Sequence, residues 1–118
     1  MSSFEKMISL IIPFYNSEST LPRCLASVEG QSIDKNSIEV ILVNDGSDDG
    51  SAEIAKDFAS RNTFATIITQ PHGGSAAARN SGITAARGKY IAFLDSDDTL
   101  SADALKISLD FFEENVER

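Results

Sequence analysis

The chain has 118 residues, of which 18 are acidic and 10 are Lys or Arg, so its formal net charge is −8. This acidic balance disfavours nucleic acid or an anionic membrane surface as the main partner, because both require a basic face. Hydrophobic residues make up 42% of the chain, enough for one core of ordinary composition, and no apolar run approaches the roughly 20 residues of a transmembrane segment.

Short apolar runs alternate with helical patterns along the chain. Strands are predicted at residues 7–13, 38–44, 66–70 and 90–95, each apolar on both faces, as is typical of buried parallel strands. Helices are predicted at about 21–30, 51–60 and 75–87, and behind Ser101, where Leu105, Leu109 and Phe112 recur on one face. This alternation predicts an α/β fold in which helices cover a parallel sheet.

The order of the strands follows from the handedness of their connections. Right-handed crossovers predict the order 3-2-1-4, which is a Rossmann-like parallel sheet with helices on both faces. The first and fourth strands then meet at a topological switch point, and a ligand would bind outside the carboxyl ends of the strands there. Because the chain has no linker or repeat, we expect residues 1–118 to form a single domain or part of one.

The single cysteine, Cys24, lies beside the apolar stripe of the first predicted helix. A lone thiol in such a position is predicted to be a packing residue, and it can form no internal disulfide. The thiol fits a reducing compartment, and the first dozen residues do not have the pattern of a signal peptide. We therefore expect a cytoplasmic protein, including at the cytoplasmic face of a membrane.

Acidic residues gather after the fourth predicted strand, where Asp95, Asp97 and Asp98 follow an apolar run. Two carboxylates about 4 Å apart repel by roughly 4 kcal/mol near a protein surface, and a cation would relieve this cost. Carboxylate oxygens suit Mn²⁺ or Mg²⁺. In an extended segment Asp95 and Asp97 would face one ion while Asp98 turns away. The alternative is that these acids cap the last helix or are solvated in a turn.

The loop after the second predicted strand carries Asp45 and Gly46. Gly46 permits a backbone sharp enough for a ligand to approach, and Asp45 can accept a hydrogen bond from a ring N–H or a hydroxyl. An Asx turn followed by a helix cap is the alternative interpretation, and the motif alone does not decide between them.

The third loop and helix combine glycines with small side chains. Gly73 and Gly74 either present backbone N–H groups to a phosphate or simply form the turn. Arg79 pairs either with the acidic loops or with a phosphate. His72 is interpreted as a turn residue. Small residues such as Gly82 predict that this helix approaches the sheet or a ligand closely.

Three segments occur in the order SLIIPFYN, VNDGSDDGS and GGSAAARNSGITAARGKYIAFLDSDD. Together they resemble the nucleotide-sugar-binding half of a family 2 glycosyltransferase with the GT-A fold, over about residues 9–100. The resemblance implies a nucleoside-diphosphate sugar as donor, preferably a UDP-sugar, and Mn²⁺ or Mg²⁺ as cofactor. It implies donor contacts from Pro13, Tyr15, Asn16, Asp45, Arg79, Asp95 and Ser96, and a metal held by Asp97 and Asp95.

Within this pattern, Pro13, Tyr15 and Asp45 would contact the base, and Asp45 would accept the base's ring N–H. Asp95 would lie near the ribose. The sequence departs from the family pattern at two positions. His72 stands where such proteins often have Asn, and Asn44 precedes Asp45 where another Asp is frequent.

The resemblance also implies metal-dependent transfer, with inversion, to the hydroxyl of a glycan, a lipid-linked or another acceptor. The catalytic base on the acceptor side would lie beyond residue 118. We therefore expect the N-terminal, donor-binding portion of a longer transferase, which does not transfer sugar by itself. The fourth strand would then be an exposed sheet edge, which favours a homodimer formed through that edge.

Two alternatives belong to other functional classes. Residues 93–99, FLDSDDT, also fit the nucleophile motif of haloacid-dehalogenase-like phosphatases, with Asp95 attacking phosphorus and Asp97 as acid and base. In such enzymes that motif opens the fold, whereas here it follows the fourth predicted strand. The second alternative is a non-catalytic nucleotide-binding or interaction module that keeps the fold without the chemistry.

Overall fold

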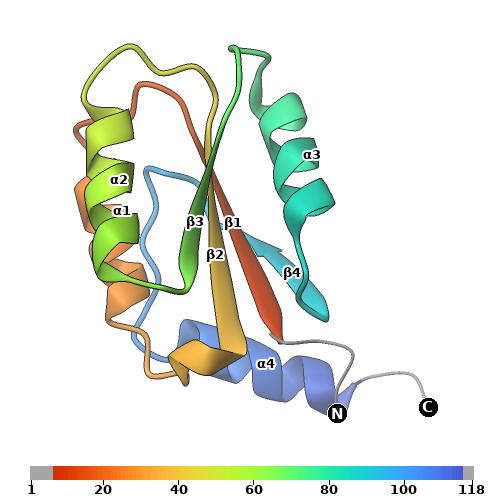
Figure 1. Cartoon of the computed structure of the whole chain (residues 1–118). Helices are drawn as coiled ribbons and strands as arrows, with labels where there is room; N and C mark the ends of the chain where they lie inside the picture. Colours follow the sequence, from red (N-terminus) through yellow and green to blue (C-terminus); the bar gives the residue numbers. More distant parts are fainter. Residues whose placement is uncertain (1–6, 116–118) are drawn as a thin grey trace.

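The structure is a computed structural model that describes residues 7–115. Its elements, in chain order, are β1 (Ile8–Phe14), α1 (Leu21–Glu29), the 3₁₀ helix η1 (Lys35–Ser37), β2 (Ile38–Asn44), α2 (Ser51–Arg61), β3 (Ala65–Thr69), α3 (Ser75–Ala85), β4 (Tyr90–Phe93) and α4 (Ala104–Glu114). The strands form one parallel sheet in the order β3-β2-β1-β4 (Figure 1). The predicted α/β class and strand order are confirmed.

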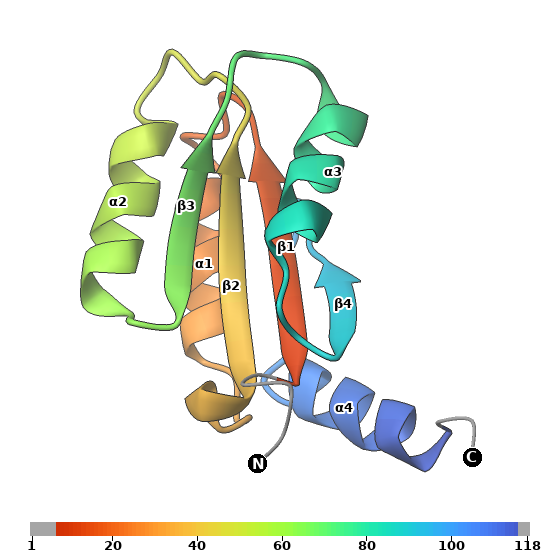
Figure 2. The same ribbon diagram turned by 45° about the vertical axis from the view of Figure 1, so that its right-hand side comes forward.

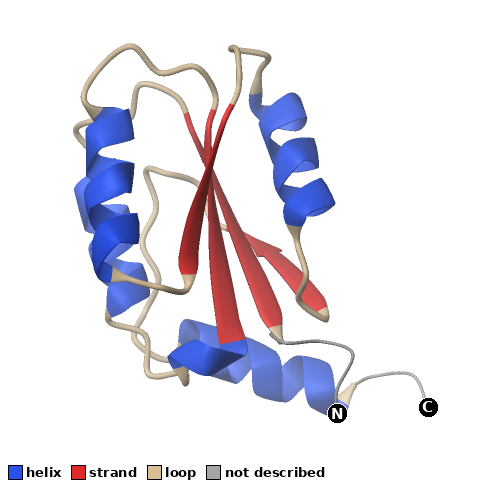
Figure 3. Ribbon diagram, in the orientation of Figure 1, coloured by secondary structure: helices blue, strands red, loops and turns tan. Residues whose placement is uncertain are grey.

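The sheet separates two layers of helices, which are seen from the side in Figure 3. On one face, Leu10 of β1 packs with Leu25 of α1 and Phe58 of α2. On the other face, Ile11 of β1 packs with Ala78 of α3. Because successive side chains of a strand point to opposite faces, the fully buried β1 contributes to both cores. The prediction of helices on both faces is confirmed.

Helix α3 lies close to the sheet because its inner face carries small residues. A Cβ atom on Gly82 would collide with Cγ2 of Ile11 in β1, so only glycine fits this contact without a shift of the backbone or the isoleucine. The predicted close approach is confirmed. The helix ends at Ala85 and not at Arg87 as predicted, because Ala86 adopts an extended backbone with φ −67° and ψ 136°.

Helix α4 lies at the end of the sheet where the strands begin, away from their carboxyl ends (Figure 2). Gln31, buried after α1, fixes the segment that leads into it. Its side-chain nitrogen donates to the carbonyl oxygens of Ser27 and Ser101, and its side-chain oxygen accepts from the backbone N–H of Leu105. Leu105 is buried, as predicted. None of the described helices has the length and apolarity that a bilayer crossing requires.

Strand β4 ends at Phe93 and not at Asp95 as predicted. The chain turns after it, with the backbone N–H of Asp98 donating to the carbonyl oxygen of Asp95 at 3.0 Å. The other predicted strand boundaries agree with the structure to within one residue. Among residues 7–115, β4 pairs only with β1, so its second edge carries no ladder.

Candidate functional site

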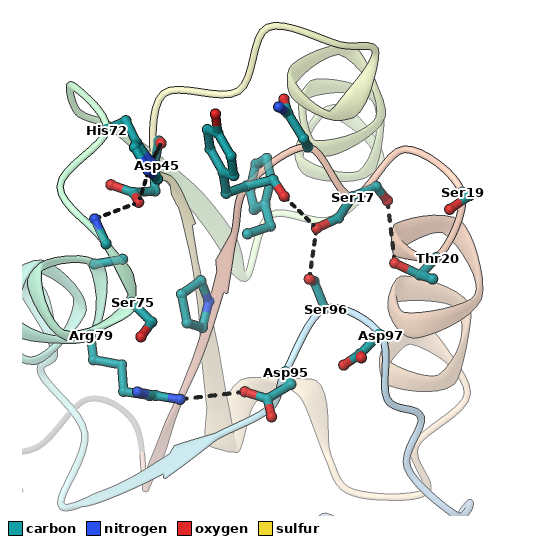
Figure 4. A pocket seen from close by; sticks show the side chains of 16 residues that line it. Ser17, Ser19, Thr20, Asp45, His72, Ser75, Arg79, Asp95, Ser96 and Asp97 are labelled. Atoms are coloured by element: carbon teal, nitrogen blue, oxygen red, sulfur yellow. Dashed lines mark hydrogen bonds and ion pairs between the residues drawn. The ribbon is translucent and has the colours of Figure 1, made fainter.

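A cleft with a volume of about 520 Å³ opens where β1, β2 and β4 end (Figure 4). Its volume lies within the range of small-molecule sites. The loop after β1, the start of α3 and the turn after β4 form its walls, so it occupies the predicted switch point between β1 and β4. Every residue predicted to contact the donor or the metal lines this cleft: Pro13, Tyr15, Asn16, Asp45, Arg79, Asp95, Ser96 and Asp97.

Asp45 is almost fully buried at the end of β2, with an exposed fraction of 3%. Its Oδ1 atom accepts hydrogen bonds from Gln70 Nε2 and the backbone N–H of Gly73, both at 2.9 Å, and its Oδ2 atom accepts from the backbone N–H of Gly74 at 2.9 Å. Burial opposes ionisation, but these hydrogen bonds and His72 outweigh it, so the pKa of Asp45 lies below its ordinary value. The Gly73 and Gly74 N–H groups therefore hold Asp45, and the alternative that they bind a phosphate is not supported.

Gly46 allows the third loop to lie directly against the second. Its φ of +79° is in the left-handed region that favours glycine, and a Cβ atom there would lie 2.6 Å from the backbone nitrogen of His72. The sharp backbone predicted at Gly46 is confirmed. The group that approaches Gly46 closely is, however, the backbone of His72 and not a ligand.

His72 is more than a turn residue. Its Nδ1 atom lies 3.1 Å from the carbonyl oxygen of Asp45 and 3.0 Å from Asp45 Oδ2, and its ring stacks on Tyr15 with centroids 4.0 Å apart and planes inclined by 28°. His72 does lie in the loop between β3 and α3, and the contacts with Asp45 and Tyr15 were not predicted. The departure from the family pattern at position 72 was the only signal in the sequence, because the partners come from different strands and loops.

Asn16 joins the loop after β1 to the loop after β2. Its backbone N–H donates to Ser47 Oγ at 2.9 Å, and its Oδ1 accepts from the backbone N–H of Asp48 at 2.9 Å. It is also the non-glycine residue with a positive φ, 48°, in the described part of the chain, a conformation that Asn tolerates better than most residues. The side-chain oxygen of Asn16 is thus engaged in shaping the wall of the cleft beside Tyr15.

The acidic turn after β4 places three carboxylates together. Asp95, Asp97 and Asp98 are exposed, and each offers an oxygen that lies within 4.8 Å of the oxygens of the other two. The prediction that Asp98 turns away is wrong, because the segment is a turn and not an extended strand. Such a set of oxygen atoms has the chemistry that a hard divalent cation requires.

Contacts from β1 and α1 hold this turn in place. Ser96 Oγ lies 2.8 Å from Ser17 Oγ, and Cys24 Sγ lies 3.7 Å from the carbonyl oxygen of Asp95. Burial, and then the charges of Asp98, Asp97 and Asp95, raise the pKa of the Cys24 thiol to about 12. The thiol is therefore protonated at neutral pH and acts as a packing residue, as predicted.

Arg79 reaches from α3 toward the same turn. Its guanidinium lies 3.6 Å from Asp95 Oδ1 (Figure 4). Of the two predicted partners, the acidic loop is therefore the one observed. Because both side chains are about half exposed, the pair contributes little to stability, and the guanidinium can exchange Asp95 for another anion at low cost.

The sheet order and the position of the cleft define a doubly wound α/β domain with its binding site at the topological switch point. The family model described as Glycosyl transferase family 2 matches residues 9–117, so the chain belongs to this family. The resemblance found in the sequence is confirmed.

Similar proteins agree with this assignment. The Bacillus subtilis protein named uncharacterized glycosyltransferase EpsJ is 47% identical over 96 residues, which are 81% of this chain and 27% of EpsJ. Staphylococcus aureus TarS 1-349, in a structure with UDP-GlcNAc, is 30% identical with a TM-score of 0.86, over 92% of this chain and 31% of that one.

A third protein shares the fold at lower identity. The mannosyltransferase PcManGT from Pyrobaculum calidifontis, in a structure with GDP-Man and Mn²⁺, is 21% identical with a TM-score of 0.86, over 98% of this chain and 36% of that one. The GT-A fold is thereby confirmed. The chain spans only 27–36% of the length of EpsJ, TarS 1-349 and PcManGT.

Proposed function

We propose that this chain is the donor-binding part of a glycosyltransferase that takes a sugar from a UDP-sugar. The observation that carries the proposal is that one cleft at the switch point is lined by Tyr15 and Asp45 at one end and by Asp95 and Asp97 at the other, where these two acids cluster with Asp98. A TarS structure with UDP-GlcNAc at 30% identity supports the choice of nucleotide.

The two ends of the cleft suit the two ends of a nucleoside diphosphate. Tyr15 is 43% exposed and offers a ring on which a base can stack. The acids after β4 lie at the other end, where the diphosphate would need a cation between itself and the protein. Arg79 is the only Arg or Lys among the described residues lining the cleft, and it stands beside those acids.

The donor atoms of the acidic turn fit Mn²⁺ or Mg²⁺. Asp95, Asp97 and Asp98 provide only carboxylate oxygens, which are the ligands hard cations prefer, and their exposure leaves room for phosphate oxygens. Asp97 and Asp95 would hold the ion. When bound, such an ion neutralises the charge that develops on the diphosphate as the bond to the sugar breaks.

The residues of this chain would then have distinct tasks. Tyr15 and the loop of Asp45 orient the nucleoside, Ser17 holds the acidic turn through Ser96, and Arg79 adds a positive charge beside the phosphates. Transfer with inversion to an acceptor hydroxyl requires a base on the acceptor side. We expect that base outside residues 1–118, so the isolated chain would bind the donor without transferring sugar.

Isothermal titration calorimetry with UDP tests this proposal. The chain should bind UDP in the presence of Mn²⁺, and Asp97→Ala should weaken binding by more than tenfold, because removing a charged ligand of the metal leaves the diphosphate repelled by the remaining acids. Asp110→Ala is the matched control, since Asp110 is an exposed acid on α4 at the other end of the sheet.

Two outcomes would count against the proposal. A folded chain that binds no UDP would support the non-catalytic interaction module instead. Hydrolysis of p-nitrophenyl phosphate that disappears in Asp95→Asn would support the phosphatase, although membership of Glycosyl transferase family 2 argues against it.

A further inference from the structure

The register between β2 and β3 brings Gln70 next to Asp45. Asn44 pairs with Thr69 in the ladder, and the backbone N–H of Gln70 donates to the carbonyl oxygen of Asn44 at 3.0 Å. Gln70 and Asp45 are the residues that follow this pair, so the two strands lead into their loops side by side. The side-chain nitrogen of Gln70 therefore reaches Oδ1 of Asp45, at 2.9 Å.

Helix α3 contributes a third side chain to this contact. Ser81, the residue before Gly82, lies where the helix approaches the sheet closely. Its Oγ atom donates to Oε1 of Gln70 and lies 3.1 Å from the carbonyl oxygen of Ala77, one turn earlier in the helix. Ser81, Gln70 and Asp45 thus form a row of hydrogen-bonded side chains that come from α3 and from the loops after β3 and β2.

The charge of Asp45 determines the direction of every hydrogen bond in this row. Because the pKa of Asp45 is lowered, its carboxylate is ionised at neutral pH and can only accept. The group of Gln70 that faces it must therefore be the NH₂ group, which leaves Oε1 facing Ser81. An amide oxygen cannot donate, so the single hydroxyl proton of Ser81 goes to Gln70 and not to Ala77. Ser81 thereby fixes the orientation of the Gln70 amide.

The two oxygens of Asp45 are engaged unequally. Oδ1 accepts from Gln70 Nε2 and from the backbone N–H of Gly73, which together fill its two lone-pair positions. Oδ2 accepts from the backbone N–H of Gly74. Nδ1 of His72 also lies 3.0 Å from Oδ2, but its hydrogen bond is to the carbonyl oxygen of Asp45, at 3.1 Å. Oδ2 therefore keeps an acceptor position.

We infer that Ser81 and Gln70 are positioning residues for nucleotide recognition, because they hold Asp45 by Oδ1 and so keep Oδ2 for a ring N–H of the donor's base. Neither residue would itself contact the nucleotide. The inference rests on the proposed function, in which the loop of Asp45 orients the nucleoside. A carboxylate fixed through one oxygen presents the other at a defined place, so less freedom is lost when the base binds.

Loss of this hold should affect one base more than another. Uracil carries a hydrogen on N3 and can donate to Oδ2, whereas N3 of cytosine carries a lone pair, so wild type should prefer UDP to CDP. Gln70→Met keeps the length of the side chain but cannot donate. We expect it to weaken binding of UDP with Mn²⁺ by about tenfold and that of CDP by at most about twofold. A general loosening of the cleft would weaken both nucleotides alike.

Ser81→Ala tests the other end of the row. Without the hydroxyl the Gln70 amide can turn over, so UDP should bind about threefold more weakly while CDP is little affected. The matched control is Thr84→Ala, because Thr84 is exposed and its hydroxyl donates to the carbonyl oxygen of Asn80 in the same helix. Calorimetry with both nucleotides measures these changes. A ratio of UDP to CDP affinity that stays at the wild-type value in Gln70→Met would refute the positioning role.

The row can also be observed without any nucleotide. The chain has only two glutamines, Gln31 and Gln70, so their side-chain NH₂ signals can be assigned in NMR spectra. At neutral pH the NH₂ group of Gln70 should be protected from hydrogen exchange, and Ser81→Ala should reduce this protection severalfold. Gln31, which donates to the carbonyl oxygens of Ser27 and Ser101, should keep its protection and serves as the internal control. Unchanged protection of Gln70 in Ser81→Ala would show that Ser81 does not hold the amide.

Failure of the inference differs from failure of the proposed function. If wild type binds UDP and CDP equally, the donor site stands and the positioning role falls. If the folded wild type binds neither nucleotide, the proposed function falls and the positioning role with it, while the exchange data still decide whether the row holds Gln70.

Discussion

The side-chain oxygens of Ser17 and Ser96 lie 2.8 Å apart, although 79 positions separate the two residues in the sequence. The backbone N–H of Ser17 also donates to Ser51 Oγ at 2.7 Å, at the start of α2. Ser17 therefore connects the acidic turn after β4 to the loops after β1 and β2. Through this residue, the acidic turn is tied to the start of α2.

Loss of the Ser17–Ser96 contact should loosen the acidic turn. We expect Ser96→Ala to weaken binding of UDP with Mn²⁺ by about fivefold, since one such hydrogen bond contributes about 1 kcal/mol. Calorimetry measures the change. The matched control is Ser60→Ala, because Ser60 is exposed and its hydroxyl donates to the carbonyl oxygen of Asp57 in the same helix, away from the cleft. Equal affinities of Ser96→Ala and wild type would show that the contact does not position the turn.

The stability of the protein should depend on the ionisation of Asp45. Its pKa in the folded protein lies below the ordinary value of 3.8, because hydrogen bonds from Gln70, Gly73 and Gly74 outweigh burial. A lowered pKa contributes stability that is complete above the pKa of the unfolded chain and is lost as the pH falls through the folded pKa. We therefore expect the free energy of unfolding of wild type to fall below about pH 4.

Asp45→Asn isolates this contribution. At neutral pH it should lower the free energy of unfolding by about 1–3 kcal/mol. The NH₂ group of the asparagine would replace one carboxylate oxygen, and it would then face an N–H donor that it cannot accept from. Below about pH 4 the difference from wild type should shrink. Urea denaturation across this range measures it, with Asp110→Asn on α4 as the exposed control. Parallel pH profiles of wild type and Asp45→Asn would contradict the assignment.

Gly82 should resist even the smallest substitution. Alanine normally stabilises a helix relative to glycine, but here its Cβ would collide with Ile11, so Gly82→Ala should lower the free energy of unfolding by about 1–3 kcal/mol. Thermal or urea unfolding measures this. Asn80→Ala, at an exposed position of the same helix, should have little effect. If Gly82→Ala costs less in an Ile11→Ala background, which removes Cγ2, the contact is its cause. A stabilising Gly82→Ala would disprove the contact.

The exposed edge of β4 should allow the chain to associate with itself. Ile91 and Phe93 of this strand are 41% and 45% exposed, next to an edge without a ladder in the described part of the chain. We expect light scattering to show dimers at high concentration and Phe93→Lys to remove them. Ile107→Lys, on the exposed face of α4, is the control. A monomeric wild type at high concentration would count against the homodimer.

Most of the fold could be predicted because it depends on local patterns. The buried runs of β1 and β2 are long enough to be recognised as central strands, and the crossover rule leaves few ways to place β4. β4 itself was predicted too long, because its apolar run continues through Leu94, whose N–H still donates to the carbonyl oxygen of Ile11, and the backbone turns only after that residue. Local composition does not reveal such a turn.

The site could be predicted only in part. Every residue that the motifs assigned to the donor or the metal lines the cleft, including Tyr15, Arg79 and Asp97. They did not show that Asp45 would be enclosed by its own neighbours, or that His72 would stack on Tyr15, since these residues meet only after three loops converge. Contacts between loops depend on the path of the whole backbone, and local sequence patterns do not reveal that path.

The amino-acid sequence by itself determined the class of the fold, the order of its strands, the family and the edge of the sheet where chemistry would gather. These depend on hydrophobic periodicity and on short motifs, both of which act over a few residues. Only the tertiary structure decided which side chains meet: Asp98 joins the acid cluster, Arg79 faces Asp95, and His72 Nδ1 lies beside Asp45. Hydrogen bonds form between whichever groups the packed sheet brings within about 3 Å, and that distance is set by the whole fold.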